Sequence, residues 1–154
     1  MKTYNHTQKI IYSIQTILFV CIIVVLSSCK KNEDEDFLLQ NEWKIKSISI
    51  DKETLKPSSK TLREDAYILK FINDTCFVMN TSVNYAGGKY QIVSEGYIFI
   101  SFQVSTKVGN ALEEQRNFDE QLFNILNDVN SYYCKGNKLF LSADKNREIV
   151  FGKR

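Results

Sequence analysis

The chain has 154 residues, enough for one domain with a single hydrophobic core, and carries a formal net charge of +2 from 20 basic and 18 acidic residues. This near balance gives no electrostatic case for binding nucleic acid or another acidic polymer. The only histidine, His6, precedes a long apolar run near the N-terminus.

Residues 1–28 have the pattern of a secretory leader. Lys2 and Lys9 give a positive start without acidic residues, and an unbroken apolar run covers residues 17–26. This run is too short to span about 30 Å of hydrocarbon, which favours a leader that is removed. An uncleaved signal anchor is the alternative.

Removal of this leader changes what chemistry the chain can perform. It takes away His6, and without Lys2 and Lys9 the 18 remaining basic residues equal the 18 acidic ones. A domain without imidazole has no Ser-His-Asp or Cys-His machinery and no histidine metal site. The two cysteines of the folded part, Cys76 and Cys134, are too few for a thiolate cluster. We therefore expect no catalytic residues, no metal and no cofactor.

The segment Leu26-Ser27-Ser28-Cys29 resembles the lipobox of bacterial lipoproteins, with Ser28 in place of the usual glycine or alanine. The resemblance implies that Cys29 becomes the mature N-terminus and carries a diacylglycerol. Two or more acyl chains, at about 0.8 kcal/mol per buried methylene, make such an anchor effectively permanent.

Residues 29–36 follow as a charged, flexible tether without apolar side chains beyond Cys29. A lysine and an acidic cluster just after the cysteine resemble the surface-export signal of Bacteroidetes lipoproteins, although Asn32 interrupts the pattern. We expect an exported outer-membrane lipoprotein, and both surface display and a periplasm-facing anchor stay open. The remaining residues, 37–154, form the folded domain.

This domain begins with short strands. Residues 37–42 resemble a short helical turn, and Trp43–Ile50 alternates apolar and polar side chains with a break between Ile45 and Ile48, which predicts a bulged strand. Residues 67–72 and 75–80 predict a hairpin around Asn73-Asp74. A two-residue turn there would place one set of side chains on the buried face: Leu69, Phe71, Cys76 and Val78.

A second hairpin is predicted around Gly87-Gly88, because paired glycines accept the positive φ of a tight turn. Asn84, Gly87 and Gly88 would then form a candidate binding loop, although turn geometry alone explains the glycines. Residues 97–102 are apolar on both faces, which predicts a strand covered on both sides.

One helix is predicted late in the chain. Apolar residues at helical spacing define it: Phe118, Leu122, Ile125, Leu126 and Val129. Asn117 and Glu120 match a capping box, and an earlier start near Leu112 stays open. A final hairpin around Gly136-Asn137 would align four side chains on one face, and a last strand covers residues 148–151; the aligned residues are Tyr132, Cys134, Leu139 and Leu141.

Together these elements predict a mainly β fold: an antiparallel β-roll or barrel of about eight short strands with one late α-helix at one end. Their order resembles the META domain, also called HslJ-like, over residues 38–152. The resemblance rests on Trp43, Leu69-Lys70-Phe71, Val83-Asn84 before Gly87-Gly88-Lys89-Tyr90, Thr106, residues 136–141 and Ile149-Val150-Phe151. Val83 replaces a frequent family cysteine, so the family's usual disulfide is absent, and the family has no established catalytic residues to carry over.

Other residues have weaker alternatives. Cys76 and Cys134 would both face the core, either as a disulfide in an oxidising compartment or as two separate buried thiols. The tyrosines at 85, 90, 97, 132 and 133 would form either an aromatic platform or a cap on the core. Acidic pairs at 113–114 and 119–120 suit the start of a helix better than a two-carboxylate glycosidase.

These patterns lead us to expect a lipid-anchored envelope protein that is not an enzyme. Its domain would bind a protein or envelope component, or support the envelope under stress, and would bind no nucleic acid. Two alternatives remain. One is a lipocalin-like carrier with a cavity lined by Phe71, Phe99 and Leu141, and the other is a protease inhibitor that uses an exposed loop at residues 103–114.

Overall fold

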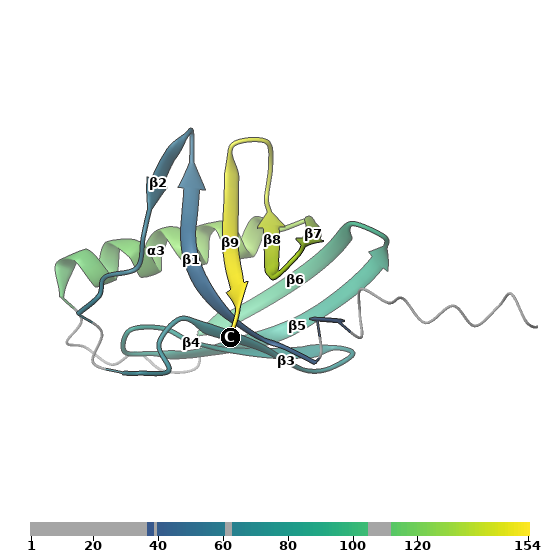
Figure 1. The fold of residues 1–154 in the computed structure, drawn as a ribbon, viewed down its shortest axis with the longest axis horizontal. Helices are drawn as coiled ribbons and strands as arrows, with labels where there is room; N and C mark the ends of the chain where they lie inside the picture. Colours follow the sequence, from purple (N-terminus) through teal and green to yellow (C-terminus); the bar gives the residue numbers. More distant parts are fainter. Residues whose placement is uncertain (1–36, 39, 61–62, 105–111) are drawn as a thin grey trace, which may run out of the picture. The chain divides into compact units, whose positions relative to one another are not determined.

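The computed structural model describes residues 37–154 apart from 39, 61–62 and 105–111. Its strands form one antiparallel sheet in the order β2-β1-β3-β4-β5-β6-β7-β8-β9, and β1 pairs also with β9 (Figure 1). This second pairing closes β1 and β3–β9 into an eight-stranded barrel, with β2 attached to β1. The predicted fold class, an antiparallel barrel with one late helix, is confirmed.

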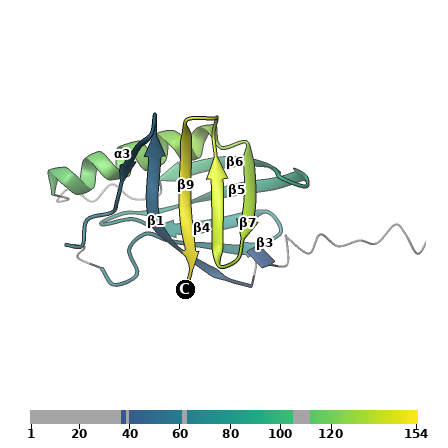
Figure 2. The ribbon, with the colours of Figure 1, turned by 45° about the horizontal axis from the view of Figure 1, so that its top comes forward.

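The described part contains nine strands and the late helix α3. Their bounds are β1 (Glu42–Ile50), β2 (Glu53–Leu55), β3 (Ile68–Asn73), β4 (Cys76–Asn80), β5 (Tyr85–Ser94), β6 (Tyr97–Val104), α3 (Glu113–Asp128), β7 (Ser131–Lys135), β8 (Lys138–Ser142) and β9 (Arg147–Lys153). In Figure 2, β1 and β9 stand side by side, β8 lies between β9 and β7, and β4, β5 and β6 run across behind these strands.

Strand β1 closes the barrel and contains the predicted bulge. Its register against β9 shifts between Ile45 and Ser47, so one extra residue is accommodated at Lys46. The bulge restores the inward direction of the apolar side chains after the break in alternation, and Trp43, Ile45 and Ile48 are all buried.

The β3–β4 hairpin forms, but its register differs by one residue from the predicted one. Phe71 pairs with Phe77, and the ladder shifts before Asn73 pairs with Cys76. The cause is the side chain of Asn73, whose Oδ1 accepts hydrogen bonds from the backbone N–H groups of Thr75 and Cys76 at 2.9 and 2.8 Å. Because a one-residue shift reverses every side chain, Phe77 faces the core.

Val78, predicted on that buried face, is consequently 45% exposed, and Cys76 lies on the same outward side. The predicted turn at Gly87-Gly88 is also wrong. Both glycines lie inside β5, and the turn that precedes this strand comprises residues 81–84.

Close approach of neighbouring backbones explains the two glycines instead. A Cβ on Gly87 would lie 2.8 Å from the carbonyl oxygen of Phe77, and one on Gly88 would lie 1.9 Å from that of Ser101. A strand with these two neighbours leaves no room for a side chain, so glycine is required here without any positive φ.

The last hairpin is confirmed as predicted. Tyr132 pairs with Leu141, Cys134 pairs with Leu139, and Gly136 adopts a φ of +57° in the turn. Strand β6, in contrast, is not covered on both faces. Ile98 is buried, whereas Tyr97 and Phe99 point outward and are 62% and 65% exposed.

Helix α3 starts earlier than the capping box at Asn117 and Glu120 predicted. It begins at Glu113, and the backbone N–H of Leu112 donates to Oε1 of Gln115 at 3.2 Å. Asn117 lies inside the helix and therefore cannot be its N-cap, because only the first four N–H groups of a helix lack a partner within it. The alternative start near Leu112 is confirmed.

The barrel interior is filled by side chains from every strand of the closed sheet and from α3. Phe37 and Leu38, which precede β1, pack beneath the indole of Trp43, whose Nε1 donates to the carbonyl oxygen of Leu38 at 3.3 Å. The largest side chains of this core are essentially inaccessible: Trp43, Tyr67, Phe77, Phe151, Leu38, Ile45, Ile48, Leu69, Met79, Ile98, Leu122 and Ile125.

Candidate functional site

A buried polar cluster lies where α3 covers the barrel end at which β3 begins and β4 ends. Asp119 of α3 is buried, and its carboxylate accepts hydrogen bonds from the Tyr67 hydroxyl at 2.8 Å and the Ser82 hydroxyl at 3.0 Å. Burial raises the pKa of Asp119, and the hydrogen bonds from Tyr67 and Ser82 oppose this rise. Burial, followed by the charge of Asp119, also raises the pKa of Tyr67.

Tyr67 joins three parts of the fold at this cluster. It has a φ of +61°, which is rare for a residue with a side chain, and its backbone is held from both sides. Its N–H donates to the Asn80 carbonyl at 2.6 Å, and its carbonyl accepts from the Ile45 N–H at 2.9 Å. Its ring packs edge-on against Phe118 of α3 at 5.1 Å. The cluster therefore fixes the helix to the barrel.

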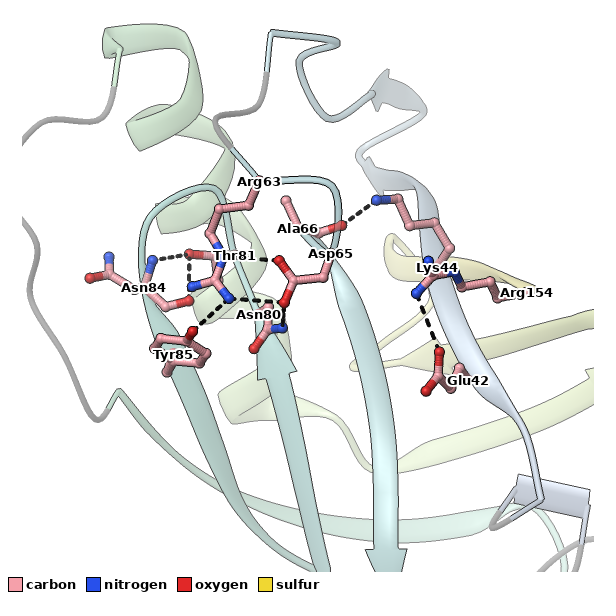
Figure 3. A network of polar contacts seen from close by, with 10 residues as sticks. All are labelled: Glu42, Lys44, Arg63, Asp65, Ala66, Asn80, Thr81, Asn84, Tyr85 and Arg154. Carbon is pink, nitrogen blue, oxygen red and sulfur yellow. Dashed lines mark hydrogen bonds and ion pairs between the residues drawn. The ribbon is translucent and has the colours of Figure 1, made fainter.

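A second, more exposed network stabilises the segment that leads into Tyr67 (Figure 3). Arg63 makes a two-pronged ion pair with Asp65 at 2.9 Å, donates to the Tyr85 hydroxyl at 2.7 Å and lies over the Tyr85 ring. The hydrogen bond from Arg63 lowers the pKa of Asp65. Asn80 Nδ2 donates to the same carboxylate at 2.5 Å. These groups satisfy one another, which indicates a structural role.

The adjoining strand β1 contributes a lysine with a similar structural task. Lys44 Nζ donates to the carbonyl oxygen of Ala66, one residue before Tyr67 (Figure 3). Burial, and then the nearby charge of Arg154, lowers the pKa of Lys44. The segment 63–67 is thus held to β1, β4 and α3 at once.

A cleft lies at the other barrel end, beside the hairpin of β5 and β6. This cleft of about 670 Å³ separates the hairpin from the β3–β4 turn. Tyr90 lines the cleft and connects the hairpin to the β3–β4 turn. Its hydroxyl donates to the Asn73 carbonyl at 2.8 Å, and its N–H donates to the Thr75 carbonyl at 2.8 Å. The lining residues are Asp74, Thr75, Lys89, Tyr90, Gln91, Ile92, Phe99, Ile100 and Ser101.

The predicted aromatic platform exists only in part. Tyr90 and Tyr132 are buried, and Tyr85 belongs to the Arg63 network at the far barrel end. Tyr97 and Tyr133 are exposed on the outer face of β6 and β7, where Phe99 also lies, and Tyr133 stacks on Phe140 at 4.3 Å. Of these three exposed aromatic side chains, Phe99 is the one that lines the cleft.

The candidate residues from the sequence do not come together. Cys29 lies outside the described residues. Asn84 closes the turn of residues 81–84, where Thr81 N–H donates to its carbonyl at 2.8 Å, while Gly87 and Gly88 lie within β5. The three form no common loop.

The two cysteines of the domain lie on β4 and β7, which β5 and β6 separate in the sheet. Cys134 packs against the core as predicted, whereas Cys76 is on the outward side of its hairpin. The disulfide between them stays a prediction.

Sequence reasoning missed the cluster around Asp119, although a signal was present. Asp119 falls between Gln115 and Leu122 at helical spacing on the stripe that faces the core, and Gln115 is likewise buried, with Nε2 donating to the carbonyl of Lys60. An acidic residue on the apolar stripe of a helix requires buried partners. Ser82 and Tyr67 supply them.

Among the residues that the structure describes, no group of three or more histidine, cysteine, aspartate or glutamate side chains could hold a metal ion. Across the same residues, no helix has the length and apolar character needed to cross a membrane.

The fold and the site define a small closed β-barrel with a packed interior, a helix fixed over one end and an open cleft at the other. The family model for the META domain matches residues 36–154, and the chain belongs to this family. The resemblance inferred from the order of the sequence motifs is confirmed.

Two solved structures share the fold. A DUF4847 family protein from Bacteroides vulgatus ATCC 8482 is 17% identical with a TM-score of 0.53, over 78% of this chain and 96% of that chain. A protein from Burkholderia xenovorans, solved by NMR, is 12% identical with a TM-score of 0.60, over 78% of this chain and 86% of that chain. No curated protein sequence matches this chain significantly.

Proposed function

We propose that this protein is a lipid-anchored envelope protein whose META domain is a non-catalytic binding module for a protein or envelope component. The observation that supports binding most directly is the exposure of Tyr97 and Phe99 on the hairpin beside the 670 Å³ cleft. Exposed aromatic residues next to a cleft of this size are typical of interaction sites.

The remaining chemistry of the domain agrees with binding rather than turnover. Asp119 and Tyr67, whose pKa values are both raised, are buried and hydrogen-bonded to each other, so they have no access to a substrate. The anchor rests on Cys29 and its lipobox-like surroundings. It would hold the domain at the outer membrane through the tether of residues 29–36.

The carrier alternative is not favoured by the position of its three expected lining residues. Phe71 and Leu141 pack within the filled core, whereas Phe99 points outward, so the three share no cavity. The inhibitor alternative depended on a loop at 103–114, most of which lies outside the described residues.

The anchor is tested by replacing the lipidated cysteine. Cells that express the wild type or Cys29→Ser are labelled with a radioactive fatty acid and fractionated. We expect label and membrane association in the wild type and the loss of both in C29S, with Cys21→Ser as the matched control that keeps both. Retention of label in C29S would remove the anchor from the proposal.

The binding surface is tested by site-specific crosslinking in intact cells. A photoreactive amino acid replaces Phe99 in one variant and Glu120, an exposed residue of α3, in the control. We expect discrete higher-mass adducts only from position 99. Equal adduct patterns from both positions, or none from position 99, would contradict a binding surface at this hairpin.

A further inference from the structure

One edge of strand β5 is open along the cleft. β5 pairs with β6 as far as Ser94, but with β4 only as far as Lys89. One further hydrogen bond crosses this edge, from the N–H of Tyr90 to the carbonyl of Thr75. Beyond that bond, no strand among the described residues pairs with β5 on this side.

The backbone of Ile92 faces this open edge. In an antiparallel ladder, successive residues direct their N–H and C=O groups to opposite edges of the strand. Tyr90 directs its N–H toward β4, so Ile92, two residues on, directs its N–H and C=O to the same side. There it meets the cleft instead of a strand, because β4 begins only at Cys76.

The side chains around this edge suit an extended ligand. Ile92 and Ile100 are partly exposed on the inner side of the hairpin, and Phe99 is exposed on the outer side. Asp74 and Lys89, of opposite charge, line the cleft with them. An added strand would direct alternate side chains to these two sides, as strands do.

A register shift between Ile92 and Ser94 limits the length of the open edge. Bulges of this kind restrict edge-to-edge association of whole sheets. The edge is therefore short, which fits a short peptide segment better than a second barrel.

We propose that this edge binds an extended peptide segment of a partner protein, which adds a strand to β5 in line with β4. The backbone of Ile92 supplies one donor and one acceptor, and the cleft receives the peptide side chains. This inference rests on the proposed binding function and names the class of partner at that site.

The test uses the protein as it is purified from membranes in detergent micelles and a phage-displayed library of random twelve-residue peptides. Peptides that are enriched on the wild type are measured against Ile92→Pro and Ile92→Ala. Proline removes only an N–H that faces the open edge, a position that a strand tolerates, and alanine keeps the N–H while it shortens the side chain. We expect I92P to weaken binding about fivefold more than I92A does, the effect of one backbone hydrogen bond.

A second measurement does not depend on how well I92P folds. Hydrogen exchange of the Ile92 amide in the wild type is followed with an enriched peptide and with its N-methylated form. We expect the unmodified peptide to slow this amide and the N-methylated form to have no effect. Equal slowing by both peptides, or protection confined to Tyr97 and Phe99, would overturn strand addition.

Failure of this inference is distinguishable from failure of the proposed function. If no peptide is enriched while Phe99 still crosslinks to a discrete partner, the module binds by another mode and the peptide inference is wrong. Slowing of the Ile92 amide that depends on protein concentration without peptide would instead assign the edge to a second copy of this chain, and would equally overturn the proposal.

Discussion

The hydroxyl of Tyr67 donates a 2.8 Å hydrogen bond to the carboxylate of Asp119, 52 residues further along the chain, and both side chains are buried. This bond joins the segment before β3 to the middle of α3. The helix is thus held on the barrel by a polar contact as well as by its apolar stripe. The position of Tyr67 at positive φ is maintained by the same contacts.

Replacement of Asp119 by alanine should lower the free energy of unfolding by about 1–3 kcal/mol, because the Tyr67 and Ser82 hydroxyls would be buried without their acceptor. Chemical denaturation of the purified protein measures the loss. Glu120→Ala, one residue on and exposed, is the control and should change stability by less than about 0.5 kcal/mol. An unchanged midpoint for D119A would show that the cluster contributes nothing.

Replacement of Tyr67 by phenylalanine should raise the pKa of Asp119 further. The hydrogen bond from Tyr67 is the largest influence that lowers this pKa against the effect of burial. Titration of the Asp119 carboxyl carbon by NMR gives the shift directly. Tyr133→Phe removes an exposed hydroxyl elsewhere and should leave the Asp119 titration unchanged. A fall in the pKa of Asp119 in Y67F would contradict the assigned hydrogen bond.

The raised pKa of Asp119 also makes a pH prediction. Because folding favours the protonated carboxyl, its contribution to stability is fully present below the pKa of the unfolded state, about 3.9. It is lost as pH rises through the higher pKa of the folded state. Asp65 and Asp144 have lowered pKa values, so their contributions to stability change with pH in the opposite direction.

The stability of the wild type relative to Asp119→Asn should therefore be greatest in acid and should decrease toward neutral pH. Unfolding curves of the two proteins from pH 3 upward measure this difference, in which the other carboxyl groups cancel. A difference that grows with pH would mean that the folded state favours the charged carboxylate.

Gly88→Ala should destabilise the barrel by about 1–3 kcal/mol, because the new Cβ would overlap the backbone of Ser101 and displace β6 from β5. Gly136→Ala is the comparison: nothing lies within 4 Å of a Cβ there, so only its positive φ opposes the substitution, at about 1 kcal/mol. Thermal unfolding of the two variants shows which substitution lowers stability more. A larger loss of stability at Gly136 than at Gly88 would contradict the close approach of the Ser101 backbone to Gly88.

Substitutions of Phe71 and Phe99 should distinguish the filled core, which contains Phe71, from the proposed binding surface, which contains Phe99. Phe71→Ala should lower the unfolding free energy by about 3–5 kcal/mol, because it leaves a cavity beside Phe77 and Tyr90. Phe99→Ala should change it by less than about 0.5 kcal/mol and should abolish partner capture at the hairpin. Equal losses of stability would place Phe99 in the core.

Elements that depend on near neighbours in the sequence could be predicted. The bulge in β1 follows from the break in alternation between Ile45 and Ile48, and the β7–β8 register follows from Gly136-Asn137 in a two-residue turn. The β3–β4 register could not be predicted in this way. The Asn73 side chain accepts hydrogen bonds from the backbone of Thr75 and Cys76, and the turn becomes one residue longer than the two-residue turn of a simple hairpin.

The paired glycines show the same limit. Gly87-Gly88 is compatible with a tight turn and with a strand pressed between two others, and only the neighbours Phe77 and Ser101 distinguish these cases. The cleft beside β5 was equally hidden, since it results from β5 pairing further with β6 than with β4.

The sequence by itself determined that the domain is an antiparallel barrel with one helix, because the period of apolar side chains and the turn residues act over a few positions. Tertiary structure alone decided which faces point inward, which edge stays open and which residues meet at Asp119. Those outcomes depend on partners such as Tyr67 and Ser82, which lie tens of residues away and have no signature in the local pattern.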